Sequence, residues 1–409
     1  MYTTNIYRLD EVKAALQYSI HNKNSEEAIF WANELIISNE LDELKNVLFV
    51  SWFHSIGLGN IEILYKILSV SDDELLNVVY GMTMLKESMR DCTMPVMFLY
   101  GIANKESKVS NIQFVLPSSL IQANQRIDTF IKTVLLGKYL AAWFLYVDIP
   151  DNILKNIIDV KYKNVFLKQL LDALHTSTYN KWYVRCAFIA MLCTREEILL
   201  EAQGSIVQID NENKQQIVEF NKIKEKRKRR CYTVPRDCLY GKTKRGTMTF
   251  QENNIHELYD PDYILENSSV FEGIEELYGS MDGFKLNSTA RNYEDFMEWY
   301  FPDDIPDEWS LEDQQKSHGI GVNQSVDKPN LRRYFNRWVN LKSTSKIWDK
   351  ETVVMNAIEK QDTFTDFYIE NECFTHYVKK EKEKEEKTSE KEKDIFNFKS
   401  IKLILSMIE

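Results

Sequence analysis

Regularly spaced apolar residues in the first sixty positions constrain the fold of this chain more than any other feature. Three sets of apolar residues recur at the three- and four-residue spacing that places side chains on one face of a helix. The sets are Leu9, Val12, Leu16 and Ile20, then Ala28, Trp31, Ala32, Leu35 and Ile36, then Leu41, Leu44, Leu48 and Trp52. They predict successive amphipathic helices, each of which must bury one face against a neighbour.

Short polar and glycine signals divide these stripes into separate helices. Asn24 and Glu27 have the spacing of a capping box, which predicts that a helix starts there. The segment Gly57-Leu58-Gly59 follows the third stripe, and glycine is the usual residue just after a helix ends. The pairs Ser71 with Glu74 and Thr194 with Glu197 predict two further helix starts by the capping-box spacing.

Composition favours an all-α fold of stacked amphipathic helical hairpins. Hydrophobic residues make up 44% of the 409-residue chain, which is enough to bury a sizeable core without disulfides or metal. Only 13 glycines and 8 prolines occur, and so few turn residues disfavour a β-sandwich or barrel. We therefore expect helices throughout, with a more irregular but mainly helical C-terminal half.

Changes in composition along the chain predict four regions. Residues 1–205 carry the helical stripes and are expected to form one helical module. Residues 206–250 are expected to form a basic helix and loop, and residues 251–378 an acidic and aromatic, irregular helical region. Residues 379–409 combine a charged linker of mixed sign with an apolar C-terminal tail.

The basic run between residues 222 and 245 is the strongest chemical feature of the sequence. The whole chain has a net charge of −11, so contact with nucleic acid would require a local cationic patch. The residues proposed to bind nucleic acid are Lys224, Lys226, Arg227, Lys228, Arg229, Arg230, Lys242, Lys244 and Arg245. The same run is also compatible with a nuclear-import signal, or with a solvated helix end that pairs with the acidic segment after it.

Two further segments combine charge with aromatic residues. The acidic segment 294–313 contains four aromatic residues that are candidates for binding a protein partner, and the alternative interpretation is an ordinary acidic surface. These four are Trp299, Tyr300, Phe301 and Trp309. Between residues 328 and 338, arginines alternate with aromatic residues, a pattern that permits stacking on bases. Such a segment more often buries its aromatic side chains and exposes its arginines.

Motifs for catalysis and for cofactor or metal binding do not occur in the sequence. Neither GxxxxGK[ST] nor GxGxxG after a strand occurs, and the six histidines form no HExxH motif. Cys231, Cys238 and His256 could form a zinc site only if folding assembled them, and a reactive Cys238 beside Lys242 is a further alternative. Inert thiols are the favoured interpretation. We expect no catalytic residue, no metal, no cofactor and no enzymatic activity.

The cysteine usage and the N-terminal sequence favour an intracellular protein. The cysteines show no framework spacing, which is typical of free thiols in a reducing compartment. No basic segment followed by an apolar one opens the sequence, and no apolar run approaches the length of a bilayer. We therefore expect a protein of the cytoplasm or nucleus, in a reducing compartment, without membrane contact.

The segments QYSIHNKNSEEAIFWANEL and FHSIGLGN, between Leu9 and Gly59, resemble the helical C-terminal region of AAA+ replication-restart ATPases related to clamp loaders. In that family the region is an oligomerisation collar beside DNA. Because the nucleotide-binding motif is missing from the sequence, the resemblance implies a collar and not ATP hydrolysis. The segments YGKTKRGTMTFQENN and DIPDEWSLEDQQKSHG also resemble uncharacterised proteins of nucleocytoplasmic large DNA viruses.

The resemblance and the basic run together predict a non-enzymatic accessory protein of viral DNA replication or genome maintenance. Such a protein would self-associate or bind protein partners through its helices and contact nucleic acid through residues 222–245. The alternative is a virion structural or assembly protein of the minor-capsid type, in which the acidic and aromatic segment and the C-terminal tail are docking elements.

Overall fold

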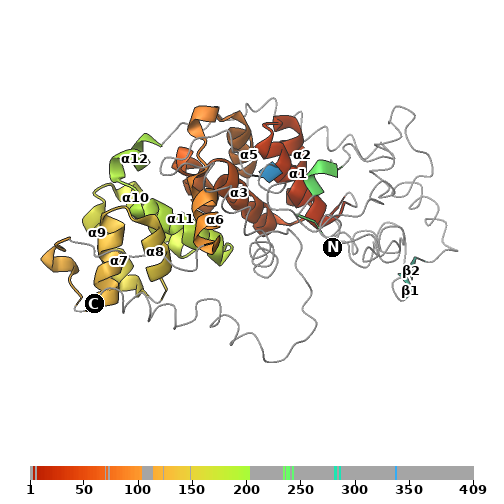
Figure 1. The fold of residues 1–409 in the computed structure, drawn as a ribbon. Coiled ribbons are helices and arrows are strands. Elements are labelled where there is room, and N and C mark those ends of the chain that lie inside the picture. The colour runs from red at the N-terminus through yellow and green to blue at the C-terminus, as the bar shows by residue number, and fades with distance from the viewer. Residues whose placement is uncertain are drawn as a thin grey trace.

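The protein has an all-α fold, as the apolar periodicity predicts (Figure 1). The computed structural model describes residues 3–4, 7–69, 71, 74–103, 114–122, 124–147 and 149–202. Beyond residue 202 it describes residues 234, 236–239, 242–243, 281–282, 285–286 and 337–338. Most of the three regions predicted after residue 205 therefore lies outside the described residues.

The first group of helices comprises α1 (Leu9–His21), α2 (Ser25–Ile37), α3 (Leu41–Ser55), α4 (Ile61–Ser69) and α5 (Leu75–Met84), with a 3₁₀ turn η1 (Gly57–Gly59). A 3₁₀ turn η3 (Glu87–Met89) leads to α6 (Thr93–Ala103). The second group comprises η4 (Ser118–Leu120), α7 (Gln125–Leu135), α8 (Tyr139–Leu145), α9 (Asp151–Lys161), α10 (Val165–His175), α11 (Lys181–Cys193) and α12 (Glu196–Glu201). Later in the chain come α14 (Arg236–Leu239) and an antiparallel pair of two-residue strands, β1 (Met281–Asp282) and β2 (Lys285–Leu286).

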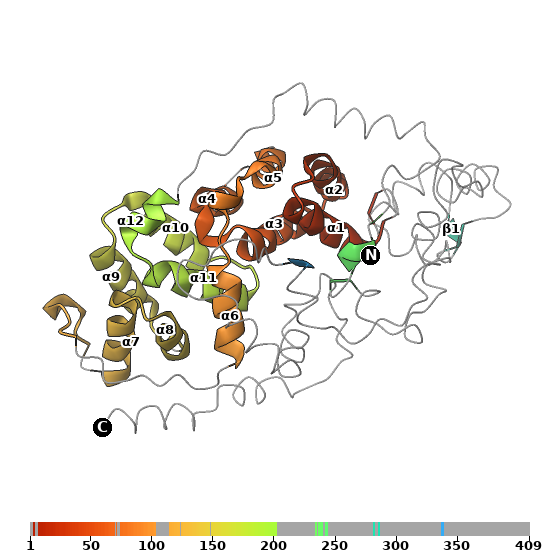
Figure 2. The same ribbon diagram turned by 45° about the horizontal axis from the view of Figure 1, so that its top comes forward.

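The two helix groups lie at opposite ends of the helical body, and α6 lies between them beside α11 of the second group (Figure 2). In the first group, α1 packs on α2, α3 and α5. In the second, α7 packs on α8, and α11 contacts α7, α8 and α10. Because α6 contacts α3 on one side and α8 and α11 on the other, the two groups share one hydrophobic core.

The residues of the predicted stripes form much of that core. All but three of the thirteen stripe residues are buried, and the remaining three, Leu9, Ile36 and Leu41, pack against the core while partly exposed. The aromatic side chains Trp31 and Trp52 are fully buried. Since each stripe faces a neighbouring helix, the helical hairpins expected from the periodicity are confirmed.

Asparagine side chains start several of these helices. The Asn24 side chain accepts a hydrogen bond from the Glu27 backbone N–H at 3.2 Å, which confirms the predicted start of α2. Asn60, Asn124 and Asn164 cap α4, α7 and α10 in the same manner. Each cap supplies an acceptor for backbone N–H groups that lack a partner within the helix.

Two predicted capping boxes are wrong. The predicted cap at Ser71 does not form, because α5 begins at Leu75 and its N-cap residue is Glu74. The Thr194 hydroxyl donates a hydrogen bond back to the Ala190 carbonyl of α11 and does not cap α12. Helix α12 begins at Glu196, and its N-cap residue, Arg195, makes no side-chain capping bond. Serine and threonine hydroxyls can serve either as caps or as donors to the preceding turn, and spacing alone does not distinguish the two.

The glycines of η1 permit a close approach between two backbone segments. Gly57 has φ +51°, and a Cβ atom there would lie 2.8 Å from the Asp91 carbonyl oxygen. A Cβ atom on Gly59 would lie 2.2 Å from the Met89 carbonyl oxygen. The Asp91 backbone N–H in turn donates to the Ile56 carbonyl at 2.9 Å. The end of α3 is thereby held against the segment that leads into α6.

No helix among the described residues is long and apolar enough to cross a membrane.

Candidate functional site

Most of the residues predicted to contact nucleic acid or a protein partner lie outside the described residues. These are Lys224, Lys226, Arg227, Lys228, Arg229, Arg230, Lys244, Arg245, Trp299, Tyr300, Phe301 and Trp309. Lys242 is described, and its side chain is buried, with 1% of its surface exposed. A lysine that binds phosphate needs an ammonium group that the phosphate can reach, so the buried position of Lys242 does not fit the role predicted for it.

The described residues around Lys242 pack on the first helix of the protein. Helix α14 contacts α1, and the two elements lie side by side in both ribbon views (Figures 1 and 2). Cys238 and Leu239 of α14 are buried and belong to the common hydrophobic core. The Leu239 carbonyl accepts hydrogen bonds from the backbone N–H groups of Lys242 and Thr243, at 3.1 and 3.2 Å, which form the turn that follows α14.

Trp338 joins the same site from a segment almost one hundred residues further along the chain. Its indole is fully buried and lies edge-on to Tyr18 of α1, with 6.0 Å between ring centroids. The Lys242 ammonium lies 5.4 Å from the centroid of the Trp338 ring, within the range of a cation–π interaction. The aromatic and basic segment 328–338 therefore buries this aromatic residue, in line with the commoner of its two interpretations.

Two histidines, the buried His54 and the partly exposed His21, lie close to this site. Burial is the main cause that lowers the pKa of His54 well below its usual value, and the nearby Lys242 ammonium lowers it further. Burial also lowers the pKa of His21 to about 4, with a smaller contribution from Arg90. Both imidazoles are therefore neutral near pH 7. His21 Nδ1 lies 3.1 Å from the Ser55 hydroxyl, which links the ends of α1 and α3.

Arg90 fixes the helix ends beside these histidines. Its guanidinium is buried and donates to the carbonyl of His21, the last residue of α1, at 3.5 Å. A second guanidinium nitrogen donates to the Met82 carbonyl in the last turn of α5 at 3.3 Å. Cations are favourable at helix C-termini, where carbonyl groups lack partners within the helix. Arg90 thus holds α1 and α5 together and has a structural role.

Three polar side chains of the second helix group, Tyr146, His175 and Asp151, contact one another, and the sequence patterns did not indicate this cluster. The Tyr146 hydroxyl lies 3.2 Å from His175 Nδ1, and His175 Nε2 lies 3.1 Å from the Asp151 carboxylate. Burial raises the pKa of Tyr146 to about 12, so its phenol stays protonated and is not an activated nucleophile. These contacts join residues 24 and 29 positions apart, and no local spacing marks them in the sequence.

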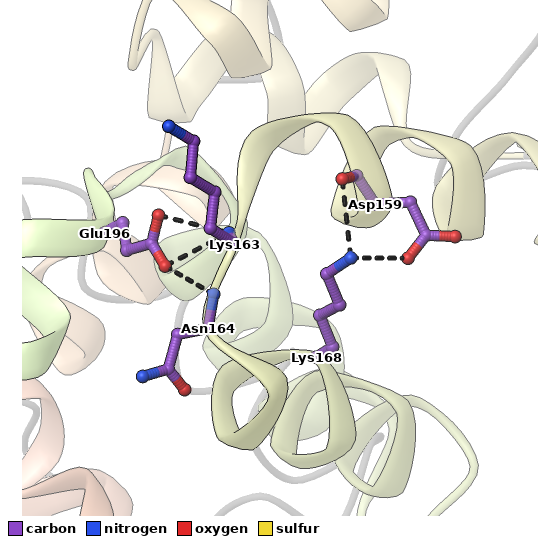
Figure 3. Close-up of polar contacts among 5 residues, drawn as sticks. All are labelled: Asp159, Lys163, Asn164, Lys168 and Glu196. Carbon is purple, nitrogen blue, oxygen red and sulfur yellow. Dashed lines mark hydrogen bonds and ion pairs between the residues drawn. The ribbon is translucent and has the colours of Figure 1, made fainter.

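Glu196 ties the linker between α9 and α10 to the start of α12 (Figure 3). Its carboxylate accepts hydrogen bonds from the backbone N–H groups of Lys163 and Asn164, the shortest at 2.7 Å. Lys168 pairs with Asp159 at 3.0 Å on the neighbouring turn (Figure 3). These contacts orient helices, and the side chains point to separate partners instead of converging on one site.

Metal ligation is not supported among the described residues. No group of three or more histidine, cysteine or acidic side chains in the described part of the chain is placed to hold a metal ion. Cys231 and His256, two of the three residues considered for zinc, lie outside that part. Cys92, Cys186, Cys193 and Cys238 are buried and are not joined in disulfides, and the covered position of Cys238 does not suit the reactive role considered for it. Comparison with family models, with curated proteins and with solved structures found no match to this chain.

Proposed function

We propose that this protein is a non-enzymatic accessory of DNA replication or genome maintenance that carries a nucleic-acid-binding basic segment on a helical scaffold. The observation that carries the proposal is the packing of α14 on α1. The cations from Lys224 to Arg230 end six residues before α14 begins, so they are joined to the helical body by a very short stretch of chain. A cationic segment attached in this way brings bound nucleic acid next to the helices.

The chemistry of the segment supports phosphate contact. Six cations occur within the seven residues from Lys224 to Arg230, on a chain whose net charge is −11. A dense local charge of this kind attracts the phosphate backbone without reading its sequence, and it does so by releasing condensed counterions. Lys242 is not part of the proposed contact set, because its ammonium faces Trp338 inside the protein.

The helical body supports the scaffold role. Its helices pack around one continuous core. The polar side chains of Arg90 and Glu196 hold helix ends and a linker in place, and they do not converge on one site. The resemblance of residues 9–59 to an oligomerisation collar suggests that this end of the body binds protein partners or further copies of the chain.

Fluorescence anisotropy with a labelled DNA duplex tests the proposed contact. We expect the full chain with Arg227, Lys228, Arg229 and Arg230 changed to glutamate to bind at least about tenfold more weakly than the unchanged protein. The slope of log affinity against log salt should fall in magnitude by about 3 to 4, since each phosphate contact contributes about 0.9.

A matched variant controls for the change in net charge. Lys138, Lys155, Lys163 and Arg195 are exposed cations of the helical body, and changing them to glutamate alters the net charge by the same amount. We expect this variant to retain most of the affinity and the salt slope. Equal loss in both variants, or full binding by the first, would contradict the proposal.

A further inference from the structure

The ends of α7, α9 and α11 meet on the second helix group, and apolar side chains are exposed there. The Lys161 ammonium, at the end of α9, donates to the Val134 carbonyl of α7 and to the Leu192 carbonyl of α11. Leu136 and Val160 lie within two residues of these contacts and expose 40% and 47% of their surfaces. Apolar side chains that are exposed singly are ordinary, whereas neighbouring ones are typical of an interaction site.

Three exposed cations surround the same helix ends. Lys138, Lys163 and Arg195 lie within three residues of the ends of α7, α9 and α11, respectively. None of these three side chains makes an ion pair within the described part of the chain. We call the three cations, together with Leu136 and Val160, the junction surface.

Most acidic side chains near the junction surface are already engaged. The Glu196 carboxylate accepts the backbone N–H of Lys163, and Asp159 pairs with Lys168 at 3.0 Å. Glu197 is exposed as well, so the three cations leave the junction surface with an excess of positive charge. An apolar centre with exposed cations around it favours an acidic partner that also carries an exposed apolar side chain.

The turn between α2 and α3 has the opposite charge and a similar apolar centre. Ile37, the last residue of α2, exposes 45% of its surface. Glu40 is partly exposed and Asp42 is exposed, and neither makes an ion pair with a described residue. Burial, and then the neighbouring carboxylates of Glu43 and Asp42, raise the pKa of Glu40, although Lys13 lowers it, so negative charge is crowded here. We call Ile37, Glu40 and Asp42 the acidic turn.

The acidic turn and the junction surface cannot meet within one copy of the protein. The acidic turn belongs to the first helix group and the junction surface to the second, and these groups lie at opposite ends of the helical body (Figure 2). The Thr4 hydroxyl donates to the Ile37 carbonyl at 3.1 Å, which ties the acidic turn to the segment before α1. Two copies arranged head to tail would bring the two surfaces together.

We propose that the junction surface of one copy binds the acidic turn of a second copy. The second copy supplies what the junction surface favours, because Ile37 offers an apolar contact and Glu40 and Asp42 offer charges opposite to its cations. Each copy uses a different surface on each side, so the contact is heterologous and leaves both end copies able to bind a further one. The inference specifies the self-association suggested for the scaffold and rests on that part of the proposed function, whereas the nucleic-acid contact is not needed for it.

Sedimentation velocity of the full chain without DNA, over a range of protein concentrations, tests the contact. We expect the weight-average sedimentation coefficient to rise with protein concentration at about 0.1 M salt. The rise should be smaller at about 0.5 M salt, because salt screens attraction between exposed charges.

Single charged substitutions at the apolar centres test the two surfaces separately. We expect Ile37→Asp and Leu136→Asp each to weaken self-association at least about tenfold. Met84→Asp is the matched control, since Met84 is 46% exposed and ends α5. Arg90 binds the carbonyls of both Met82 and His21, which places the end of α5 beside the end of α1 and away from the acidic turn. This control should self-associate as the unchanged protein does.

An equimolar mixture of Ile37→Asp and Leu136→Asp is the decisive sample. Each variant keeps the surface that the other has lost, so one intact contact remains between unlike copies. We expect the mixture to form dimers and no larger species, while each variant alone stays monomeric at the same concentration. Far-UV circular dichroism of each variant checks that both are folded.

Three results would overturn the inference. The unchanged protein could stay monomeric at all concentrations, or Ile37→Asp could associate no more weakly than Met84→Asp. The mixture of the two folded variants could also stay monomeric, which would show that the two surfaces do not bind each other. Each of these results leaves DNA binding by the basic segment untouched, so it is distinguishable from a failure of the proposed nucleic-acid contact.

Discussion

Besides α3, which is followed by Gly57, three of the described helices end with one residue in the left-handed conformation, and two of these three residues are not glycine. Lys23 after α1 has φ +61°, Asn39 after α2 has φ +60°, and Gly137 after α7 has φ +66°. At α1, the Lys23 backbone N–H donates to the Ile20 carbonyl and that of Asn24 donates to the Ser19 carbonyl. This is the Schellman pattern, in which glycine is the favoured residue because a Cβ atom is strained there.

At position 23, the protein should therefore be more stable with glycine than with alanine. Lys23 pairs with Glu87 at 2.7 Å, and both substitutions remove that surface ion pair. The difference between Lys23→Gly and Lys23→Ala then isolates the backbone conformation. We predict that Lys23→Gly has the higher free energy of unfolding, by about 1 kcal/mol, in urea denaturation. Equal stability of the two variants, or greater stability of the alanine variant, would show that α1 does not end in this conformation.

Lys242 shows what the sequence could and could not indicate about a single residue. Its place near a dense basic run predicted an exposed, phosphate-binding side chain. The structure buries it against Trp338, a residue 96 positions further along the chain. Charge patterning describes the local sequence, whereas burial depends on which distant segment returns to cover a residue. For the same reason, the pairing of His175 with Asp151 and the buried position of His54 had no signal in the sequence.

The ends of α7, α9 and α11 meet at one point of the second helix group. The Lys161 ammonium donates to the Val134 and Leu192 carbonyls, and burial lowers its pKa to about 8. The Tyr162 hydroxyl lies 2.8 Å from the Met191 carbonyl oxygen and also within reach of two further carbonyls at the end of α11. These side chains supply further donors to carbonyl groups at helix ends, of which those of Val134 and Met191 also accept one backbone hydrogen bond each.

Removing the Tyr162 hydroxyl should therefore destabilise the second helix group. Tyr162→Phe keeps the buried ring but leaves carbonyl groups of α11 with one donor fewer, which costs about 1–3 kcal/mol. Tyr139 contacts the Thr194 hydroxyl at 3.0 Å from a partly exposed position, so Tyr139→Phe should cost less than about 1 kcal/mol. Thermal unfolding of both variants measures the difference. A smaller effect of Tyr162→Phe than of Tyr139→Phe would contradict this role of the Tyr162 hydroxyl.

At the level of elements, the sequence predicted the helices better than their boundaries. The stripes in residues 9–52 and the Asn24 cap agree with the structure because helix periodicity and asparagine capping are local properties. The boxes at Ser71 and Thr194 failed because the helix start also depends on tertiary contacts. At α12, Glu196 reaches back to the linker before α10. That contact joins residues 32 positions apart, beyond the range of any capping rule.

At the scale of the whole molecule, the first helix connects the N-terminal body with the later chain. Helix α1 packs on α2, α3 and α5, and it also receives α14 and Trp338. Local patterns predicted that α1 is amphipathic, but they contained no information on which segments cover it. Helix α14, which packs on α1, begins six residues after Arg230, the last cation of the run from Lys224 to Arg230.

Hydrogen–deuterium exchange of the full chain, with and without a saturating DNA duplex, tests most directly whether the basic segment is the nucleic-acid contact. We predict that the duplex slows exchange in peptides from residues 222–230 and leaves exchange in α2 (Ser25–Ile37) unchanged. The α2 helix is the internal reference because it is held by α1, α3 and α5 within the body. Unchanged exchange in residues 222–230 at saturating duplex, together with protection elsewhere, would contradict the proposed contact.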